Sequence, residues 1–437
     1  MNGISEYHSV ELQDDRCKGC TICVTACPVE AIRVHGGKAH ILEEKCIDCG
    51  ECIRVCPNRA KYAITNTIKD ISPYKKSVVL TDPTLYAQFN ERFTEQDIEQ
   101  ALQSLGFSSV YKISDTEKEL SKVATIWLQN HFNEKDALRP IISSSCPAVV
   151  RLIQVRFPSL IEHLLPLISP AEVCAKKARK ENDTDTEIYF ISPCPAKITI
   201  TRSPLGYNDS QIDKVLNMED LYLPILGALN KLPHINTNSN YKIDNQWCCS
   251  SGESQSINNL FLKTKKSLKW LNASGIKQTI DMLENAEDGT LGNFDFLELN
   301  ICQGGCIGGP LTINPQPVAE ALLRRYNPEK SENSKTLCNN TENILANSDI
   351  SSYLFTSVII SRPSRLLSNN FAKARKMMEE IESTLDLLPG FDCGSCGAPN
   401  CRAFAEDIVR GNAKLDDCVF VMKRRYEDLL FGNKTRN

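Results

Sequence analysis

Twenty cysteines in a chain of 437 residues constrain its fold more than any other feature. Eight of them lie in two tight runs between positions 17 and 56. Disulfide-rich scaffolds are usually small and secreted, whereas this chain is long, and its first residues lack the basic and apolar segments of a secretion signal. Cysteines at such spacings in a cytosolic protein are more often metal ligands. We therefore expect a cytoplasmic metalloprotein.

The charge balance and the hydropathy pattern exclude two classes of partner. Fifty basic and 54 acidic residues leave a formal net charge of −4. This balance argues against nucleic acid, whose binding proteins usually carry a basic footprint. The sequence contains no run of about 20 apolar residues, so we expect no membrane-spanning helix.

The two N-terminal runs share the spacing C-x2-C-x2-C-x3-C-P. In such a run, three closely spaced thiolates hold one iron–sulfur cubane and the fourth cysteine reaches the other cluster. The pattern is typical of two [4Fe–4S] clusters that carry electrons, with zinc or structural thiols as the alternative. It resembles the bacterial two-cluster ferredoxin family. The first cluster would be held by Cys17, Cys20, Cys23 and Cys56, and the second by Cys46, Cys49, Cys52 and Cys27.

The cysteine pattern predicts three domains. Residues 1–75 would form an α+β ferredoxin-like domain, 76–365 an α/β domain with parallel sheet, and 366–437 a small helical domain. Two stretches rich in Asn and Ser, 234–246 and 327–351, are expected to be surface loops. We predict a hairpin at 32–42 with its turn at Gly36 and Gly37, strands at 76–80 and 187–191, and helices at 95–105 and 370–381.

Three separated cysteine motifs lie in the central segment. They are Ser143-Ser-Ser-Cys146-Pro147, Ile191-Ser-Pro-Cys194-Pro-Ala-Lys197, and Glu298-Leu-Asn-Ile-Cys302-Gln-Gly-Gly-Cys306-Ile-Gly-Gly309. A cysteine at a strand end or helix start can have its thiolate stabilised by backbone N–H groups. The paired glycines would let the backbone pass close to a bulky cofactor. Each motif alone is weak evidence, but their combination favours a metal site.

The three motifs resemble the signature loops TSCCP, MPCxxK and ExMACxxGCxxGG of the [FeFe]-hydrogenase catalytic domain. The resemblance implies two lobes around an H-cluster, which joins a [4Fe–4S] cubane to a two-iron subcluster carrying CO, CN⁻ and a dithiolate. It implies that Cys306 also bridges to the two-iron part and that Lys197 hydrogen-bonds a cyanide. Four further residues are expected at the cofactor pocket. The implied cubane ligands are Cys146, Cys194, Cys302 and Cys306, and the pocket residues are Ser144, Pro147, Ser192 and Asn300.

Several positions depart from that family's pattern. Ser145 replaces the proton-transfer cysteine, and a hydroxyl has a much higher pKa than a thiol. The segment 118–127, where acidic relay residues are expected, contains no matching carboxylate pair. Leu165 and Ala171 replace a relay serine and a glutamine. The usual proton path is therefore expected to be absent. The alternative interpretation is that water or Ser145 provides another route for the proton.

Four cysteines near the C-terminus have the spacing C-x2-C-x4-C-x16-C. Three thiolates would come from a loop rich in Gly and Pro, and the fourth from beyond a helix. The pattern resembles the four-cysteine domain of corrinoid iron–sulfur proteins, which also follows hydrogenase domains in sensory homologues. We expect one more [4Fe–4S] cluster, with zinc as the rival. Its ligands would be Cys393, Cys396, Cys401 and Cys418.

Four cysteines match no motif. Cys174 falls on a helical pattern and is expected to be a buried thiol. Cys248 and Cys249, beside Trp247, could lie near the active site, although adjacent cysteines are more often incidental. Cys338 lies in a polar stretch without an evident role, and the six histidines show no ligand spacing.

The leading functional hypothesis is a cytoplasmic hydrogenase of low turnover that splits or forms H2 and senses H2 or redox state. Its partners would be H2, protons and a ferredoxin-like or signalling protein, and a homodimer is left open. The alternative is a hydrogenase-like electron carrier or iron–sulfur assembly protein that lacks the two-iron subcluster. A bifurcating enzyme is a third interpretation, and the absence of flavin or nucleotide motifs would then require other subunits.

Overall fold

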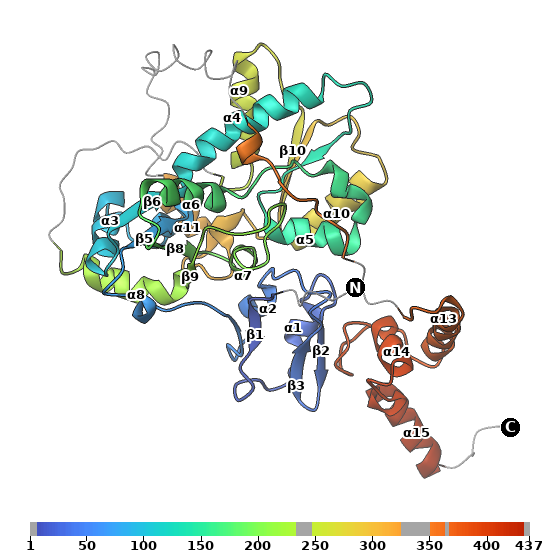
Figure 1. Ribbon diagram of the computed structural model, residues 1–437. Coiled ribbons are helices and arrows are strands. Elements are labelled where there is room, and N and C mark those ends of the chain that lie inside the picture. The colour runs from blue at the N-terminus through green and yellow to red at the C-terminus, as the bar shows by residue number, and fades with distance from the viewer. Residues whose placement is uncertain (1–6, 233–246, 325–349, 363–366, 432–437) are drawn as a thin grey trace. The chain divides into compact units, whose positions relative to one another are not determined.

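The computed structural model describes residues 7–232, 247–324, 350–362 and 367–431 (Figure 1). Two compact units are interleaved along the chain. The first comprises Met1–Ser9, Ile47–Cys49 and Ile64–Ser361, and the second Val10–Cys46, Gly50–Ala63 and Arg362–Asn437. Cys338, the predicted domain boundary at 365 and 366, and nearly all of the two predicted polar loops lie outside the described residues.

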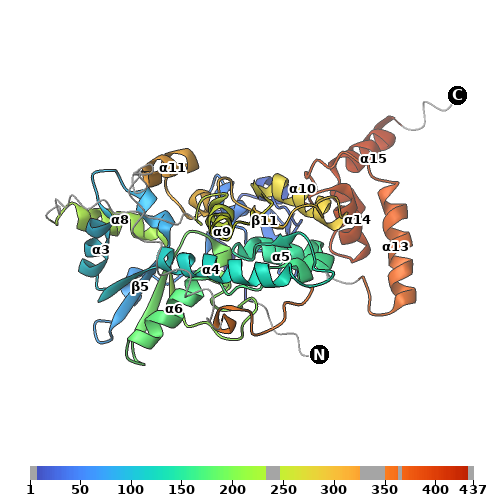
Figure 2. The same ribbon diagram turned by 90° about the horizontal axis from the view of Figure 1, so that it is seen from above.

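A four-stranded parallel sheet forms one core of the first unit, in the order β6-β5-β8-β9. Every residue of its second strand is buried, as expected for a parallel sheet covered on both faces. Helices α3, α8 and α11 pack on one face and α6 on the other (Figure 2). The elements are β5 (Ser77–Thr81), β6 (Ser109–Lys112), β8 (Glu187–Ser192), β9 (Lys214–Asn217), α3 (Glu95–Ser104), α6 (Pro170–Glu181), α8 (Met218–Leu229) and α11 (Gln316–Arg324).

A smaller parallel sheet, ordered β10-β11-β7, forms the second core of this unit. The long helix α4 packs against α9 and α6, and their apolar side chains form a second buried cluster. The α/β class with parallel strands is thus confirmed. The elements are β7 (Ile141–Ile142), β10 (Trp270–Ser274), β11 (Phe296–Asn300), α4 (Ile113–His131), α5 (Pro147–Arg156), α7 (Pro195–Thr199), α9 (Gly252–Lys263) and α10 (Ile276–Glu287).

Short 3-10 helices connect these elements. The connections that leave β5, β7, β8 and β11 all begin at the carboxyl ends of parallel strands, which is where ligands bind in open α/β sheets. The short helices are η1 (Ile68–Asp70), η2 (Pro83–Gln88), η3 (Pro158–His163), η4 (Cys306–Gly308), η6 (Ser351–Tyr353) and η7 (Leu415–Asp417).

The second unit begins with two antiparallel pairs, β1 with β4 and β2 with β3. The predicted hairpin is confirmed, and Gly36 and Gly37 make its turn with φ of 58° and 74°. A one-turn helix contains the third cysteine of each run. The elements are β1 (Val10–Leu12), β2 (Ile32–His35), β3 (Lys38–Ile41), β4 (Lys61–Ala63), α1 (Ile22–Thr25) and α2 (Glu51–Arg54).

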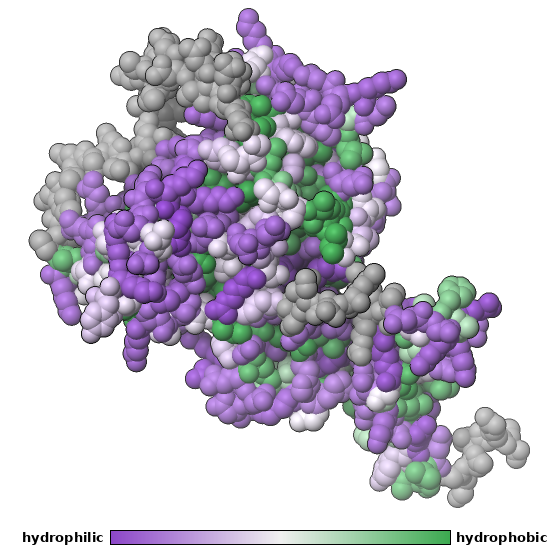
Figure 3. Space-filling view, viewed as in Figure 1, coloured by the Kyte–Doolittle hydropathy of each residue, from purple (hydrophilic) through white to green (hydrophobic). Residues whose placement is uncertain are grey.

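Three helices near the C-terminus complete the second unit: α13 (Phe371–Leu385), α14 (Cys401–Val409) and α15 (Val419–Phe431). Helix α13 confirms the predicted helix at 370–381, and Asn370 caps it by accepting the N–H of Lys373. Helix α15 exposes several apolar side chains, and Figure 3 shows apolar colour among polar residues in this part of the chain.

Contacts within the second unit join its N-terminal and C-terminal parts. Arg33 Nε lies 2.5 Å from Asp407 Oδ2, and both side chains are buried. The N–H of Val34 donates to the carbonyl of Gly397 at 2.8 Å. The two stretches of sequence therefore share one hydrogen-bonded and buried interface.

In the part of the chain that the structure describes, no helix combines the length and the apolar character needed to cross a bilayer.

Candidate functional site

Four cysteines of the central motifs converge in the first unit. Cys146 and Cys194 are the N-caps of α5 and α7, Cys302 follows β11, and Cys306 begins η4. The thiol of Cys194 lies within electrostatic range of Cys302 and Cys146, and that of Cys306 within range of Cys194 and Cys146. The structure therefore brings the predicted set together.

Burial raises the pKa of the Cys194 thiol to about 12 and that of Cys306 well above its ordinary value. As free thiols, both would stay protonated at neutral pH. Metal coordination deprotonates a thiol outright, and buried soft thiolates suit iron–sulfur clusters. The donor set therefore fits a metal cluster better than a set of free thiols.

The glycines of the third motif allow close backbone approach beside these cysteines. Gly305 has φ of +93°, and a Cβ there would lie 2.7 Å from the carbonyl oxygen of Cys248. A Cβ on Gly309 would lie 2.5 Å from the carbonyl oxygen of Pro193. Both approaches require glycine, so the motif brings the cysteine loops together.

A cavity adjoins Cys306, and Ser145, Pro147, Lys197, Trp247 and Cys248 contribute to its lining. The three residues predicted to be catalytic, Cys306, Lys197 and Ser145, thus meet at one cavity. The presence of Cys248 in the wall favours the interpretation that this member of the adjacent pair lies near the candidate site rather than being incidental.

Lys197 is held at the cavity by a residue that sequence reasoning missed. Its Nζ lies 2.6 Å from Oδ2 of Asp82, which is buried at the end of β5. Burial alone would lower the pKa of Lys197, but Asp82 and the thiols of Cys306 and Cys194 outweigh burial and raise it well above its ordinary value. The side chain is therefore a fixed cation facing the cysteines.

Ser145 contacts a buried carboxylate. Its Oγ donates to Glu253 Oε2 at 2.8 Å, and Ser143 Oγ donates to the same oxygen at 2.5 Å. Burial and the neighbouring charge of Glu298 raise the pKa of Glu253 to about 8. Burial also raises the pKa of Glu298, to about 7, although it accepts the N–H of Ser254. Ser145 thus contacts the carboxyl group of Glu253, which in turn lies near that of Glu298, and both carboxyl groups titrate near neutral pH.

A third carboxyl group, that of Glu117 on α4, also lines the cavity. Burial and the nearby charge of Asp82 raise its pKa well above the ordinary value. Glu117 lies one residue before the segment 118–127, where the family resemblance places acidic relay residues. The residues 118–127 contain no matching carboxylate pair, as expected, but Glu117 lines the cavity and Glu253 accepts a hydrogen bond from Ser145, and both lie outside that segment.

Ser144 and Pro147 lie on the loop and helix that follow β7. Ser144 Oγ donates to the carbonyl of Leu167 at 3.1 Å, whereas Pro147 is the first residue of α5 and lines the cavity. Ser144 therefore ties two loops together, and Pro147 faces the cavity.

Ser192 and Asn300 hydrogen-bond within their own loops. Ser192 Oγ donates to the carbonyl of Cys194 at 2.9 Å, and Asn300 Nδ2 donates to Glu298 Oε1 at 3.4 Å. Neither is among the cavity-lining residues. Their side chains instead hold a cysteine loop and a carboxylate in place.

The first predicted N-terminal set lines a single cavity in the second unit, namely Cys17, Cys20, Cys23 and Cys56. This placement agrees with the exchange of the fourth cysteine between the two runs. Of the second predicted set, Cys27, Cys46 and Cys52 belong to the second unit and Cys49 to the first.

The C-terminal set also lines one cavity, formed by Cys393, Cys396, Cys401 and Cys418. Hydrogen bonding with Ser395 lowers the pKa of Cys393, whereas burial raises that of Cys396. The structure therefore places the four predicted ligands around one cavity.

Outside these sets, Cys174 is buried on α6, and burial raises its pKa to about 12, in agreement with the predicted buried thiol.

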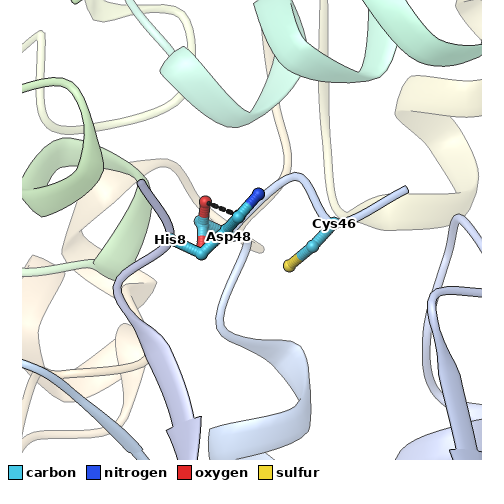
Figure 4. Close-up of side chains that lie close together, drawn as sticks. All are labelled: His8, Cys46 and Asp48. Carbon is cyan, nitrogen blue, oxygen red and sulfur yellow. Dashed lines mark hydrogen bonds and ion pairs between the residues drawn. The ribbon is translucent and has the colours of Figure 1, made fainter. Parts of the chain in front are cut away.

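In the first unit, His8 Nδ1 lies 2.9 Å from Asp48 Oδ2 (Figure 4). The histidines of the sequence gave no signal for this pair.

Comparison with protein families matches each part of the chain. Residues 75–239 and 236–310 match the model of the iron-only hydrogenase large subunit, C-terminal domain, which covers more than half of the chain. Residues 9–57 match a 4Fe-4S dicluster domain, and residues 388–420 match a model for an Fe–S cluster.

Solved [FeFe]-hydrogenases resemble the chain in fold. A structure from a study of oxygen inactivation of the H cluster has a TM-score of 0.52 at 14% identity, and it covers 68% of this chain and 97% of that one. A variant of HydA1 from Chlamydomonas reinhardtii has a TM-score of 0.52 at 15% identity with the same coverage.

The curated relatives match a short stretch. An uncharacterized protein of Methanocaldococcus jannaschii is 41% identical over 56 residues, which are 13% of this chain and 25% of that protein. One component of an ion-translocating oxidoreductase complex of Rhodobacter capsulatus is 40% identical over 52 residues, 11% of this chain and 28% of that protein. The chain thus spans about a quarter of the length of these relatives.

Proposed function

This chain belongs to the iron-only hydrogenase family and carries further iron–sulfur domains, and from that premise we propose that it reacts with H2 slowly and senses H2 or redox state. The observation that carries the proposal is the cavity where Cys306, Lys197 and Ser145 meet. An electron carrier needs no small-molecule cavity beside its cluster. A cation and a proton-exchanging group at that cavity are features of a reactive site.

The residues present fit an H-cluster. Cys146, Cys194, Cys302 and Cys306 would hold the cubane, with Cys306 also bound to the two-iron part. When bound, this group supplies reversible heterolysis of H2. Lys197, fixed by Asp82 at 2.6 Å, offers a donor and a positive charge to an anionic ligand such as cyanide.

The chain's own residues then handle the proton. Ser145 Oγ can pass a proton to Glu253, with which it shares a hydrogen bond of 2.8 Å, and Glu298 lies next in electrostatic range. Carboxyl groups with pKa values of about 8 and about 7 suit proton exchange near neutral pH. The serine is the slow link, because its hydroxyl ionises far less readily than a thiol. This slow link favours low turnover and a sensory role.

Electrons would leave through the accessory clusters. The N-terminal sets would hold two [4Fe–4S] clusters, and Cys393, Cys396, Cys401 and Cys418 a further one, for which zinc is the rival metal. The partner that receives the electrons would be a ferredoxin-like or a signalling protein.

Infrared spectroscopy of protein purified anaerobically from its host tests the proposal. Iron-bound CO and CN⁻ absorb in a window where protein does not, so bands that shift under H2 are the expected result. A blank spectrum from protein with full iron–sulfur content, which persists after addition of a synthetic two-iron complex, would contradict the proposal. The chain would then be an iron–sulfur electron carrier or assembly protein.

A further inference from the structure

Lys61, on β4, is a buried cation without a hydrogen-bond partner. Its side chain is 3% exposed, and among the described residues its Nζ has no partner. A buried unpaired ammonium is costly, and such a group in a native protein points to an interaction with something else, for example an ion or cofactor.

The unpaired ammonium lies at the cavity of the first N-terminal cysteine set. Lys61 lines this cavity together with the four thiols. Its charge also reaches the thiol of Cys23: burial raises the pKa of Cys23, and Lys61 opposes that rise. Thiolates and a cluster that they hold are anionic, so they would supply the counter-charge that Lys61 lacks.

The internal repeat of the two runs shows that this lysine is an asymmetric feature. The runs are offset by 29 residues, from Cys27 to Cys56, and this offset carries Ile32 onto Lys61. The backbone follows the same repeat. The N–H of Ala31 donates to the sulfur of Cys27 and the N–H of Ala60 to that of Cys56, both at 3.2 Å.

The two equivalent positions therefore differ in charge and agree in burial. Ile32 is 2% exposed and Lys61 3% exposed. Because the fourth cysteine of each run serves the other run's cluster, the residue five positions later accompanies that cluster. The first cluster is thus accompanied by the buried positive charge of Lys61. The second cluster has the apolar side chain of Ile32 at the equivalent position.

We propose that Lys61 raises the reduction potential of the first cluster above that of the second cluster. The electron is then stored on the first cluster, which is held by Cys17, Cys20, Cys23 and Cys56. Reduction adds one electron to the cluster and makes or breaks no covalent bond. A nearby cation stabilises the additional negative charge, and the low-dielectric interior screens this attraction little. The electron comes from any donor to the relay, so the inference does not depend on the reaction with H2.

The test is a redox titration of the full chain with its clusters, followed by electron paramagnetic resonance. Lys61→Ile, which makes the two halves of the repeat alike, should move one cluster to lower potential and leave the others in place. Lys61→Arg should keep the original value. The matched control is Lys18→Ile, because Lys18 lines the same cavity but is exposed, and its removal should shift the potential much less.

Iron content separates tuning from assembly. Unchanged potentials in Lys61→Ile at full iron content would overturn the proposal. If Lys61→Ile loses iron, Lys61→Met, whose side chain is similar in length, replaces it in the titration. Loss of the cluster in both neutral variants but not in Lys61→Arg would make the charge an assembly requirement and would also overturn the tuning role.

Discussion

Glu253 offers a residue-scale test of the proton route. Glu253→Gln keeps the shape of the side chain and can still accept from Ser145, but it cannot take up and release a proton. We expect H2 evolution to fall by about 10²-fold, in the range typical of a lost acid–base group. The exposed Glu162→Gln is the matched control and should leave the rate unchanged. An unaltered rate in Glu253→Gln, measured with equal cofactor content, would remove Glu253 from the route.

Ser145 carries the second residue-scale prediction. Ser145→Cys places a thiol, whose pKa is ordinarily near 8.5, at the cavity beside Glu253. We expect faster H2 evolution, by about 10-fold or more, if proton delivery limits turnover. Ser143→Cys is the control, since Ser143 also bonds Glu253 but does not line the cavity. No gain in Ser145→Cys with intact cofactor would contradict the account of slow turnover.

The raised pKa of Glu253 also predicts how stability depends on pH. The folded pKa is about 8 and the ordinary value 4.5, so between them the folded state retains a proton that the unfolded state has lost. The free energy of unfolding then falls by about 1.4 kcal/mol per pH unit as pH rises through that window. Glu253→Gln lacks this loss. Its stability relative to the parent chain should therefore increase with pH.

Unfolding midpoints at equal iron content, followed by circular dichroism between about pH 5 and pH 7, measure this difference. Glu298 titrates in both proteins, so only the difference between them is informative. Parallel pH profiles of the two proteins would show that the folded pKa of Glu253 is not raised.

Sequence spacing could indicate the N-terminal and C-terminal cysteine sets because their members lie in short stretches of chain, whereas the central set was expected only from the family resemblance. Cys17, Cys20 and Cys23 lie in one short stretch of chain and line one cavity. The partners of the reactive side chains are different. Asp82 is 115 residues from Lys197, and Glu253 is 108 from Ser145. Only the packing of α9 and of β5 beside the cysteine loops brings these pairs together, so no local pattern could reveal them.

At the scale of elements, the loop between Cys396 and Cys401 depends on its contact with β2. Gly397 has φ of +88°, and a Cβ there would overlap the carbonyl oxygen of Val34. Gly397→Ala should therefore loosen this contact. Gly411→Ala is the matched control, because Gly411 has φ of +80° with nothing within 4 Å. The control should lose only about 1–2 kcal/mol from the left-handed backbone.

Amide hydrogen exchange distinguishes the two variants. The N–H of Val34, which donates to Gly397, should exchange faster in Gly397→Ala than in Gly411→Ala. Equal exchange in both would mean that β2 does not depend on the cysteine loop for protection.

The regular elements followed from local signals, whereas their lateral order did not. Paired glycines predicted the β2–β3 hairpin, and buried apolar runs predicted β5 and β8. Strands β10 and β7 both flank β11, although residues 142 and 270 are far apart in the sequence. Contacts of such long range are fixed by packing between helices and sheets, which the pattern of single segments does not encode.

At the scale of the whole molecule, a buried ion pair joins distant parts of the chain within the second unit. Arg33 and Asp407 are 374 residues apart in sequence and bond at 2.5 Å. Arg33 also donates to the carbonyls of Glu30 and Ile32. The C-terminal four-cysteine part and the N-terminal cysteine runs are therefore joined by a buried network of polar contacts around Arg33.

Removing one partner of this pair should cost more than removing both. Asp407→Leu leaves the guanidinium buried and unpaired, and we expect the second unit to lose about 3–5 kcal/mol of stability. The double variant Arg33→Met with Asp407→Leu replaces the pair by apolar side chains and should recover most of that loss. Denaturant unfolding followed by the visible absorption of the clusters measures both. Equal losses in the single and double variants would mean that the pair contributes through packing alone, and the two parts would then be held together by the backbone bond of Val34 and its neighbours.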